Sequence, residues 1–581
     1  LMPVKRRSSR PVLSAAKLRI AQYNLRSMLK LAALIENPGE PPIETRYRDP
    51  HVLREMGYNG LAIYETTALA GVESAEVVSD SELRRWLGTR IEHVERAIET
   101  ASAAGLEVHL FYDVLVLPED VVRQHGQSVT CRGNRAGALC PASEAAFDLS
   151  VRALRAMLQR WPAVAGVVLR FGETDAPRLP HLTGNDIYTP HCPRCSQLGR
   201  ADRIVNTIER FHQLVVGEFD KRLIARAWNV RPGGLHDSVE LAQRVVERLP
   251  GEERDQRLVL SFKFTHTDFW RYQKWNPASL ACGRRPILYE LQCQREFEGK
   301  GAMPNWQTGL WRDGPPEVGD EVGGLAQVRE RVNLAGLWAW VRGGGWGGPF
   351  ISNESWIDAN VFAAPRLADD PQMGARELAD AWIAQRLGVE GEALAACVRA
   401  ILEHSPEVAR QAFYIGPLAE RKSDPWHPSG DWIQDDLIDA QAAWRIIQRL
   451  PEGTLDAAVQ EKEAAAARVS ADRATLQQLV SDRAHAALEP LVNTLIYAES
   501  LCETLRDLIA GLVAYRRFLK QRTPAAAEVA RQKMLAAQSH WNHHTQRHGS
   551  LPGAATAFRE AHFWELTQQV LVEVSEVQAR E

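Results

Sequence analysis

Short apolar runs alternate with longer amphipathic stretches from residue 18 to about residue 342. Apolar runs of about four to eight residues are typical of strands buried on both faces, whereas apolar positions three and four apart indicate helices. We predict eight strands, at residues 18–23, 60–64, 107–114, 165–171, 223–230, 258–264, 287–293 and 334–341. Eight strands separated by helices predict an α/β fold, a (β/α)8 TIM barrel.

The strand pattern ends near residue 366, and helical periodicity then continues almost to the last residue. We therefore predict a lead of residues 1–17, a catalytic barrel over residues 18–366 and a helical C-terminal domain over residues 367–581. Within this domain, residues 491–512 carry a stripe of leucines and one alanine at steps of three and four. Residues 416–431 are rich in Pro, Gly and charge, and we expect this segment to reach toward the barrel mouth.

The composition excludes several classes of protein. The 581 residues are 45% hydrophobic and 24% charged, and 69 basic against 73 acidic residues leave a formal net charge of −4. This balance gives no field to hold nucleic acid or an anionic membrane, so a small ligand is the expected partner. No apolar run reaches the roughly 18 to 20 residues of a membrane span, and no signal-peptide core precedes the first strand. We expect a cytoplasmic protein.

The eight cysteines are too sparse for the disulfide framework of a secreted protein. Cys192 and Cys195 have the spacing of half a zinc site, which Cys131 and Cys140 could complete in space. A single pair at this spacing is a weak signal, so ordinary loop thiols are the favoured interpretation, and we predict no metal and no cofactor.

Three carboxylates follow three successive apolar runs: Glu173, Asp268 and Glu296. The carboxyl ends of the strands of a barrel converge on one face, so these acids could surround a single sugar. Cleavage of a glycosidic bond requires one carboxylic acid and one carboxylate on opposite sides of the bond. Any one of these acids alone could equally be a solvated loop residue or the partner of an arginine.

Several segments, in order, resemble the α-glucuronidases of glycoside hydrolase family 67. They are RFGETDAP around Glu173, LSFKFTHTDFW around Asp268, ILYELQCQREFEGKG around Glu296, then AMPNWQTGLW and RGGGWGGPFISNESW. The resemblance covers residues 18–366 and, more loosely, the helical region. It implies that Glu173 is the general acid of an inverting hydrolysis, with Asp268 and Glu296 sharing the role of general base. It also implies a homodimer.

By the same resemblance, Lys263 and Arg226 bind the carboxylate of a uronic acid, a role that suits fixed cations in a desolvated pocket. The sequence departs from the family in two respects. The family has a β-rich domain before its barrel, and its lysine before the acid is replaced here by Leu169, with Arg170 next in the chain. Arg170 is the expected substitute, although neighbouring strand residues face opposite sides.

Three further residues are expected to bind substrate. Trp228 and Trp270 offer faces for sugar stacking. His266 either contacts a sugar hydroxyl or adjusts Asp268, with a hydrogen-bonded loop histidine as the equal alternative. We predict an exo-acting, inverting hydrolase that removes terminal α-linked (4-O-methyl-)glucuronic acid from oligosaccharides. The alternatives are a related hydrolase of another α-linked uronide or a neutral glycan, and a catalytically weak carbohydrate-binding protein.

Overall fold

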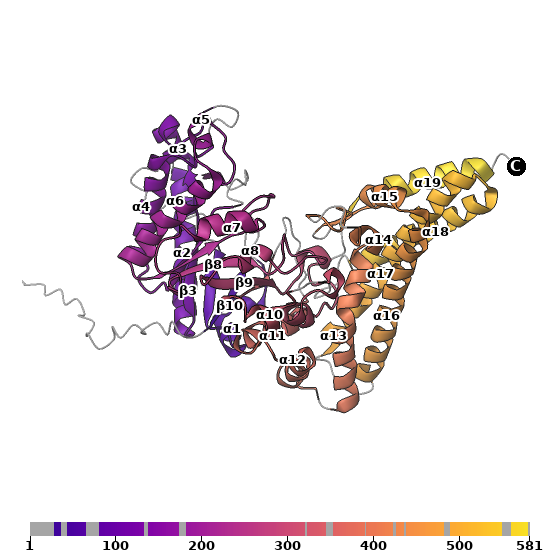
Figure 1. The fold of residues 1–581 in the computed structure, drawn as a ribbon. Helices are drawn as coiled ribbons and strands as arrows, with labels where there is room; N and C mark the ends of the chain where they lie inside the picture. Colours follow the sequence, from indigo (N-terminus) through magenta and orange to yellow (C-terminus); the bar gives the residue numbers. More distant parts are fainter. Residues whose placement is uncertain are drawn as a thin grey trace, which may run out of the picture.

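A computed structural model describes most of the chain. It covers residues 28–35, 43–64, 81–132, 138–172, 182–319, 322–343, 353–389, 391–421, 426–434, 437–481, 488–548 and 559–578. Figure 1 shows the barrel strands, in indigo to magenta, in one part of the molecule and the long C-terminal helices, in orange to yellow, in the other.

Eight parallel strands close into a barrel, which confirms the predicted fold class. In spatial order they are β1 (Leu29–Leu34), β2 (Gly60–Ile63), β3 (Glu107–Asp113), β5 (Gly166–Arg170), β7 (Arg222–Arg226), β8 (Leu258–Lys263), β9 (Pro286–Gln292) and β10 (Asn333–Arg342). Parallel pairing of β10 with β1, in which Trp338 lies opposite Leu31, completes the circle. Seven of these strands overlap predicted ones.

The prediction of the first strand was wrong. Residues 18–23 lie outside the described residues, and the strand that pairs with both β10 and β2 is β1, Leu29–Leu34. Both segments are short apolar runs, so a local pattern does not separate them. Pairing on two sides, which only the closed barrel provides, determines which run becomes the strand.

Most helices around the barrel bury one face, whereas the helix Ile357–Asp369 is buried on nearly all sides. They are α1 (Pro50–Glu55), α2 (Ser81–Ala103), α4 (Glu144–Arg160), α6 (Arg200–His212), α7 (Val239–Val246), α8 (Pro277–Leu280), α9 (Thr308–Asp313), α10 (Leu325–Val328) and α11 (Ile357–Asp369). In α2, the buried positions Leu87, Val94, Ile98 and Ala101 follow the predicted helical spacing. Helix α11 packs on β1 and β10 and runs through residue 366, so we propose that the barrel ends after Asp369.

Two insertions extend the barrel at the carboxyl ends of its strands. The segment after β3 contains β4 (Val116–Pro118) and α3 (Glu119–His125). The segment after β5 contains β6 (Leu182–Gly184) and α5 (Pro193–Ser196). Strands β4 and β6 pair antiparallel, so the two insertions form one substructure.

The C-terminal region is helical, as predicted, with a small sheet added. Its helices are α12 (Ala375–Trp382), α13 (Glu392–Phe413), α14 (Gly416–Ala419), α15 (Ala440–Arg449), α16 (Leu455–Ser481), α17 (Glu489–Gln521), α18 (Pro524–His548) and α19 (Phe563–Gln578). The sheet consists of β11 (Ile433–Gln434), β12 (Leu437–Asp439) and β13 (Arg559–Ala561). The leucine stripe of α17 is buried within the chain, where α16 and α18 pack against this helix.

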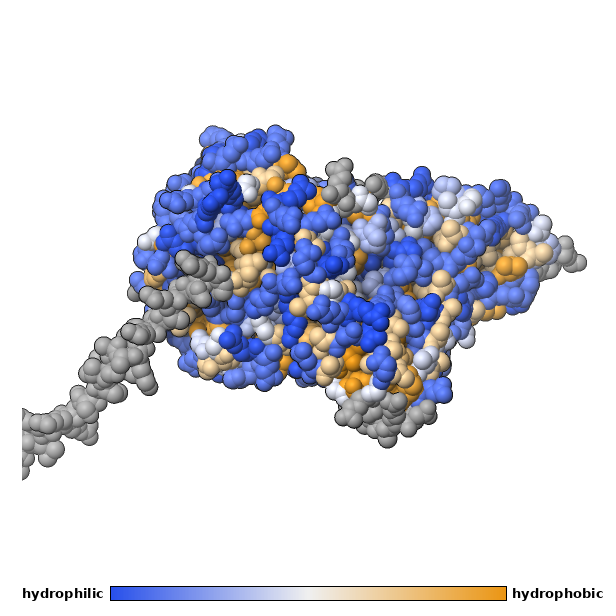
Figure 2. All heavy atoms as spheres, turned by 60° about the horizontal axis from the view of Figure 1, so that its bottom comes forward, coloured by the Kyte–Doolittle hydropathy of each residue, from blue (hydrophilic) through white to orange (hydrophobic). Residues whose placement is uncertain are grey.

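The barrel and the helices share one continuous hydrophobic core. Hydrogen bonds also join them: the Trp356 indole nitrogen donates to the Leu491 carbonyl at 3.2 Å, and the Asn353 side chain donates to the Pro490 carbonyl at 2.6 Å. The face in Figure 2 is mostly hydrophilic, with small scattered hydrophobic areas. None of the described helices has the length and hydropathy needed to span a membrane.

Candidate active site at the barrel mouth

Charged side chains occupy the carboxyl ends of four neighbouring barrel strands. Asp113 ends β3, Arg170 ends β5, Arg226 ends β7 and Lys263 ends β8, and in the strand register Asp113 lies opposite Arg170 and Arg170 opposite Arg226. All four residues are buried. A buried charge is costly unless it has a partner, so the pairing of each one defines the chemistry of this face.

The first ion pair joins β3 to β5. The Arg170 guanidinium grips both carboxylate oxygens of Asp113 and also donates to the Tyr64 hydroxyl. The same guanidinium lies 5.0 Å from the centroid of the Tyr64 ring. Arg170 therefore faces the barrel interior, as a residue that binds a uronate would have to. Its positive charge, however, is already neutralised by Asp113.

The second ion pair centres on Glu290, an acid in β9 that the sequence interpretation missed. Both Glu290 oxygens accept hydrogen bonds from Arg226, through Nε and Nη2 at 3.0 Å each. Ser261 and the indole of Trp340 donate to the same carboxylate at 2.8 and 3.0 Å. A charged residue inside the otherwise apolar run ILYEL was the available signal for this site. Arg226 is thus fixed by a fully buried carboxylate.

The third pair brings two of the predicted site residues together. The Lys263 ammonium contacts Oδ1 of Asp268, which also accepts the backbone N–H of Phe269 at 2.7 Å. The ammonium lies 3.5 Å from the centroid of the Trp228 ring. The Lys263 side chain is 6% exposed and that of Asp268 19% exposed, so the carboxylate is the more accessible partner.

Glu296 follows the end of β9 in a tight turn. The preceding residue, Arg295, has a left-handed backbone with φ of 59°, and the Glu296 N–H donates to the Gln292 side chain at 2.9 Å. Phe297 stacks on Trp270, with ring centroids 3.8 Å apart and planes 9° apart. Because Trp270 lies two residues after Asp268, this stack holds the segments that carry the two predicted base residues side by side.

A buried network supports this turn from below. The carboxylate of Glu298 accepts hydrogen bonds from Arg271, Arg295, Asn305 and the Tyr414 hydroxyl. Burial alone would raise the pKa of Glu298, but the guanidinium groups of Arg271 and Arg295 hold it well below its usual range. Tyr414 follows α13, so the helical region takes part in positioning the turn.

The helical region also supplies part of the wall. Trp426 stacks over Trp228 with ring centroids 6.2 Å apart and planes 14° apart, and His427 meets the Trp270 ring edge-on at 6.1 Å. These contacts confirm that the polar segment 416–431 reaches the barrel mouth. Both predicted tryptophans are almost completely buried, with exposed fractions of 1% for Trp228 and 3% for Trp270, so neither ring has a face open to a sugar.

Of the two remaining predicted residues, only His266 is described, and it is not brought onto this cluster. His266 directs its Nε2 to the carbonyl of Asp237 at 3.2 Å, which ties the loop after β8 to the loop after β7. Glu173 lies outside the described residues. Its neighbour Gly172 is described and packs so closely on the backbone of Trp228 that an added Cβ would lie 2.3 Å from the Trp228 carbonyl oxygen.

Three buried donors at the mouth have no acceptor among the described residues: the indole N–H of Trp228 and the side-chain amides of Gln292 and Gln294. Gln292 ends β9 and Gln294 follows two residues later. These three nitrogen atoms have almost no accessible surface, so they are enclosed by the protein and do not line an open binding surface. They were not predicted from the sequence.

Comparisons with known proteins define the class of fold. No family model and no curated protein matches the chain. Among solved structures, a GH138 enzyme targeting the pectin rhamnogalacturonan II is similar with a TM-score of 0.57 at 11% identity, over 95% of this chain and 84% of that chain. CpGH89 from Clostridium perfringens, in complex with its substrate GlcNAc-α-1,4-galactose, is similar with a TM-score of 0.50 at 9% identity, over 95% of this chain and 63% of that one. The family 67 resemblance rests on the sequence motifs alone.

Proposed function

We propose that the chain is a glycoside hydrolase whose active site lies at the carboxyl-end face of the barrel. The observation that carries this proposal is the Trp270–Phe297 stack, which keeps the segments of Asp268 and Glu296 side by side above Lys263. Two carboxylates carried by neighbouring segments at this face suit the cleavage of a glycosidic bond. The fold likeness to the GH138 and GH89 proteins supports the same assignment.

In the proposed reaction, Glu173 protonates the leaving oxygen while Asp268 and Glu296 position and deprotonate the attacking water. The outcome is inversion at the anomeric carbon. Lys263 compensates the charge of Asp268. In the proposed complex it also binds the anionic group of the substrate.

The proposed substrate is an oligosaccharide with a terminal α-linked glucuronic acid or its 4-O-methyl form, attacked from its end. This assignment follows the resemblance, in which Lys263 and Arg226 meet the uronate carboxylate. One observation favours a second candidate, a hydrolase of another α-linked uronide or a neutral glycan. Each of the three buried cations, Arg170, Arg226 and Lys263, already has its own carboxylate partner. A pocket compensated in this way attracts an anionic sugar less strongly than one with free cations.

The test is release of free sugar from aldouronic oligosaccharides and from a panel of neutral α-linked oligosaccharides, with the anomer of the product followed by NMR. Glucuronic acid appearing first as the β-anomer supports the full proposal. Release from neutral substrates alone supports the second candidate. The Glu173→Gln and Glu296→Gln variants should lose turnover, and Glu240→Gln, a substitution of a carboxylate with an 81% exposed side chain, is the matched control.

A catalytically weak carbohydrate-binding protein is the remaining alternative. Calorimetric binding of an oligosaccharide that is never cleaved at high protein concentration would support it and overturn the hydrolase. Homodimerisation is also part of the proposal, and light scattering tests it. The leucine stripe of α17 is buried inside the chain, so a dimer would have to use another surface.

A further inference from the structure

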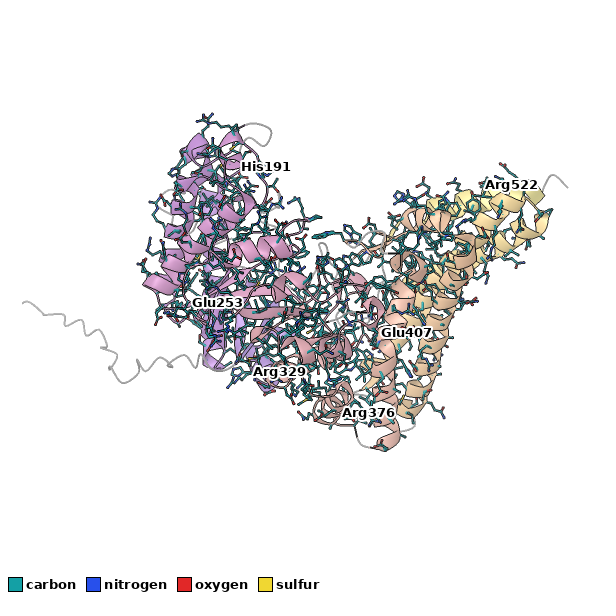
Figure 3. All side chains as sticks on the ribbon, viewed as in Figure 1. His191, Glu253, Arg329, Arg376, Glu407 and Arg522 are labelled. Carbon is teal, nitrogen blue, oxygen red and sulfur yellow. The ribbon has the colours of Figure 1, made fainter. Side chains whose placement is uncertain are left out.

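Four cysteines from two distant segments meet in one cluster away from the barrel mouth. Cys131 and Cys140 lie in the insertion after β3, and Cys192 and Cys195 lie at α5 in the insertion after β5. Their four sulfur atoms all lie within 4.8 Å of one another. Figure 3 labels His191, the residue before Cys192, in the part of the molecule where Figure 1 places α3 and α5.

The backbone holds each pair of cysteines in place. Thr130 and Leu139 form an antiparallel bridge, and the Cys131 N–H donates to the Ala138 carbonyl at 2.8 Å, so Cys131 and Cys140 lie on neighbouring chain segments. Cys192 is the N-cap of α5 and Cys195 lies within that helix, which places their sulfur atoms 3.5 Å apart. The two pairs meet where the sulfur atoms of Cys140 and Cys192 are 3.7 Å apart.

These separations match a tetrahedral thiolate site. A zinc–sulfur bond of about 2.3 Å places the sulfurs of a tetrahedron of four cysteines about 3.8 Å apart. The measured sulfur separations of 3.5 and 3.7 Å are near this value and far beyond the roughly 2.05 Å of a disulfide bond. All eight cysteines of the chain are free thiols.

Packing separates this cluster from ordinary buried cysteines. Cys282, Cys293 and Cys502 belong to the main hydrophobic core, where a thiol acts as a small apolar side chain. The four clustered cysteines instead form a group of their own, with Ala142 as the one partly buried hydrophobic packed against it among the described residues. The burial of these four cysteines is therefore not explained by packing into the main apolar core.

Hydrogen-bond donors surround the sulfurs. The backbone N–H groups of His191 and Cys192 donate to the Cys195 sulfur at 3.1 and 3.2 Å. The Arg194 guanidinium donates through Nε to the Cys140 sulfur at 3.3 Å and through Nη2 to the Thr130 carbonyl at 3.0 Å. Donors of this kind orient thiolate ligands and offset the negative charge of a four-thiolate metal site.

We propose that Cys131, Cys140, Cys192 and Cys195 bind one structural zinc ion that joins the insertion after β3 to the insertion after β5. A tetrahedral set of four thiolates suits zinc or an iron–sulfur centre, and four protein ligands leave no open position for substrate. The ion would lock the substructure in which β4 pairs with β6. Glu173 lies in the chain segment between Gly172, which follows barrel strand β5, and Leu182, which begins β6. Because β6 pairs with β4, one end of this segment belongs to the substructure that the ion would hold together. The proposal does not depend on the hydrolase assignment.

The test measures metal in the full chain, purified without metal-affinity resin or chelator. Mass spectrometry of the metals should find about one zinc per chain, released when an organomercurial blocks the thiols. Replacement by Co²⁺ should produce the absorption bands of tetrahedral cobalt–thiolate coordination. Iron at the same stoichiometry, less than about one tenth of a zinc per chain, or two disulfides found by intact mass would each overturn the proposal.

Variants localise the ion. Cys192→Ser and Cys131→Ser should each lower bound zinc at least tenfold, because loss of one thiolate breaks a closed four-ligand site. Cys397→Ser, a substitution of a half-buried cysteine on α13, should retain wild-type zinc. If the site variants do not fold, the stoichiometry, thiol release and cobalt spectrum of the wild type still decide the question. Full zinc retention in both site variants would contradict the assignment of the ligands.

Discussion

Trp270 and Phe297 stack face to face, with ring centroids 3.8 Å apart, and so join the segment of Asp268 to the segment of Glu296. The two rings come from loops that follow different strands, β8 and β9. An offset or stacked aromatic pair contributes about 0.5–1.5 kcal/mol beyond the area it buries. Together with the buried Arg271–Glu298 ion pair, the stack therefore fixes how the segments of the two proposed base residues lie relative to each other.

Loss of this stack should impair turnover more than substrate binding. Trp270→Leu removes the aromatic face and lets the two loops separate, and a displacement of about 1 Å can cost about 100-fold in rate. We expect kcat to fall between about 10- and 100-fold while KM changes little. Trp270→Phe keeps a ring against Phe297 and is the matched control. Equal losses in the two variants would show that the indole acts in another way.

Asp268 is expected to be essential for turnover, with a separable effect on stability. Asp268→Asn should lower kcat/KM by about 10²- to 10⁴-fold, the usual contribution of a general base. It also leaves the Lys263 ammonium without its carboxylate, at a cost of up to about 3 kcal/mol of unfolding free energy.

The double variant Lys263→Met/Asp268→Asn separates these two effects. Calorimetry should show that it regains most of the lost stability, because the unpaired ammonium of Lys263 has been removed. It should remain inactive, because the carboxylate of Asp268 is still missing. Recovery of activity together with stability would show that Asp268 serves the fold alone.

Much of the fold was accessible from the sequence. Seven barrel strands appear in the sequence as short apolar runs, and the helices α2 and α4 appear as apolar positions three and four apart. Local patterns therefore sufficed to predict these elements. The first strand was misplaced because the local pattern alone did not single out Leu29–Leu34, which is the run that pairs with β10 and β2.

The site was predicted in part for a similar reason. Asp268 and Lys263 lie five residues apart and were assigned to one site by motif. Glu290 was missed because its partners, Arg226 and Ser261, lie on other strands and meet it only in the closed barrel. The four cysteines were recognised in the sequence as a possible group, but loop thiols were favoured because only one pair has the spacing of a zinc site. The approach of the two pairs across residues 131–195 is visible only in the fold, where β4 pairs with β6.

The buried pair of Arg226 and Glu290 should behave as a stability element. Glu290→Gln leaves the guanidinium uncompensated in the barrel and is expected to lower the unfolding free energy by about 3–5 kcal/mol. In the double variant Arg226→Gln/Glu290→Gln no charge is left unpaired, so most of this loss should be recovered. Denaturant unfolding followed by tryptophan fluorescence measures both. A stable single variant, or a double variant no better than the single, would contradict this role.

The helical region contains a histidine that should make the protein sensitive to acid. The His544 ring is buried beside Tyr497 and Trp541, and its Nδ1 lies 2.6 Å from the Ser500 hydroxyl. Burial, with a smaller effect of His548, lowers the pKa of His544 from 6.5 to about 3. The folded chain therefore keeps this ring neutral at a pH where the unfolded chain protonates it.

Between pH 6.5 and about pH 3, the unfolded state binds one more proton at His544 than the folded state. The contribution of neutral His544 to the free energy of unfolding is therefore complete above about pH 6.5 and declines as the pH falls toward 3. A difference of this size corresponds to about 2 kcal/mol lost at pH 5. His544→Gln keeps a polar partner for Ser500 and does not titrate. Its calorimetric melting temperature should therefore fall less than that of the wild type between pH 7.5 and pH 5, and the pH 7.5 measurement controls for the change in packing. An identical acid response in the two proteins would mean that His544 is protonated before the fold is lost.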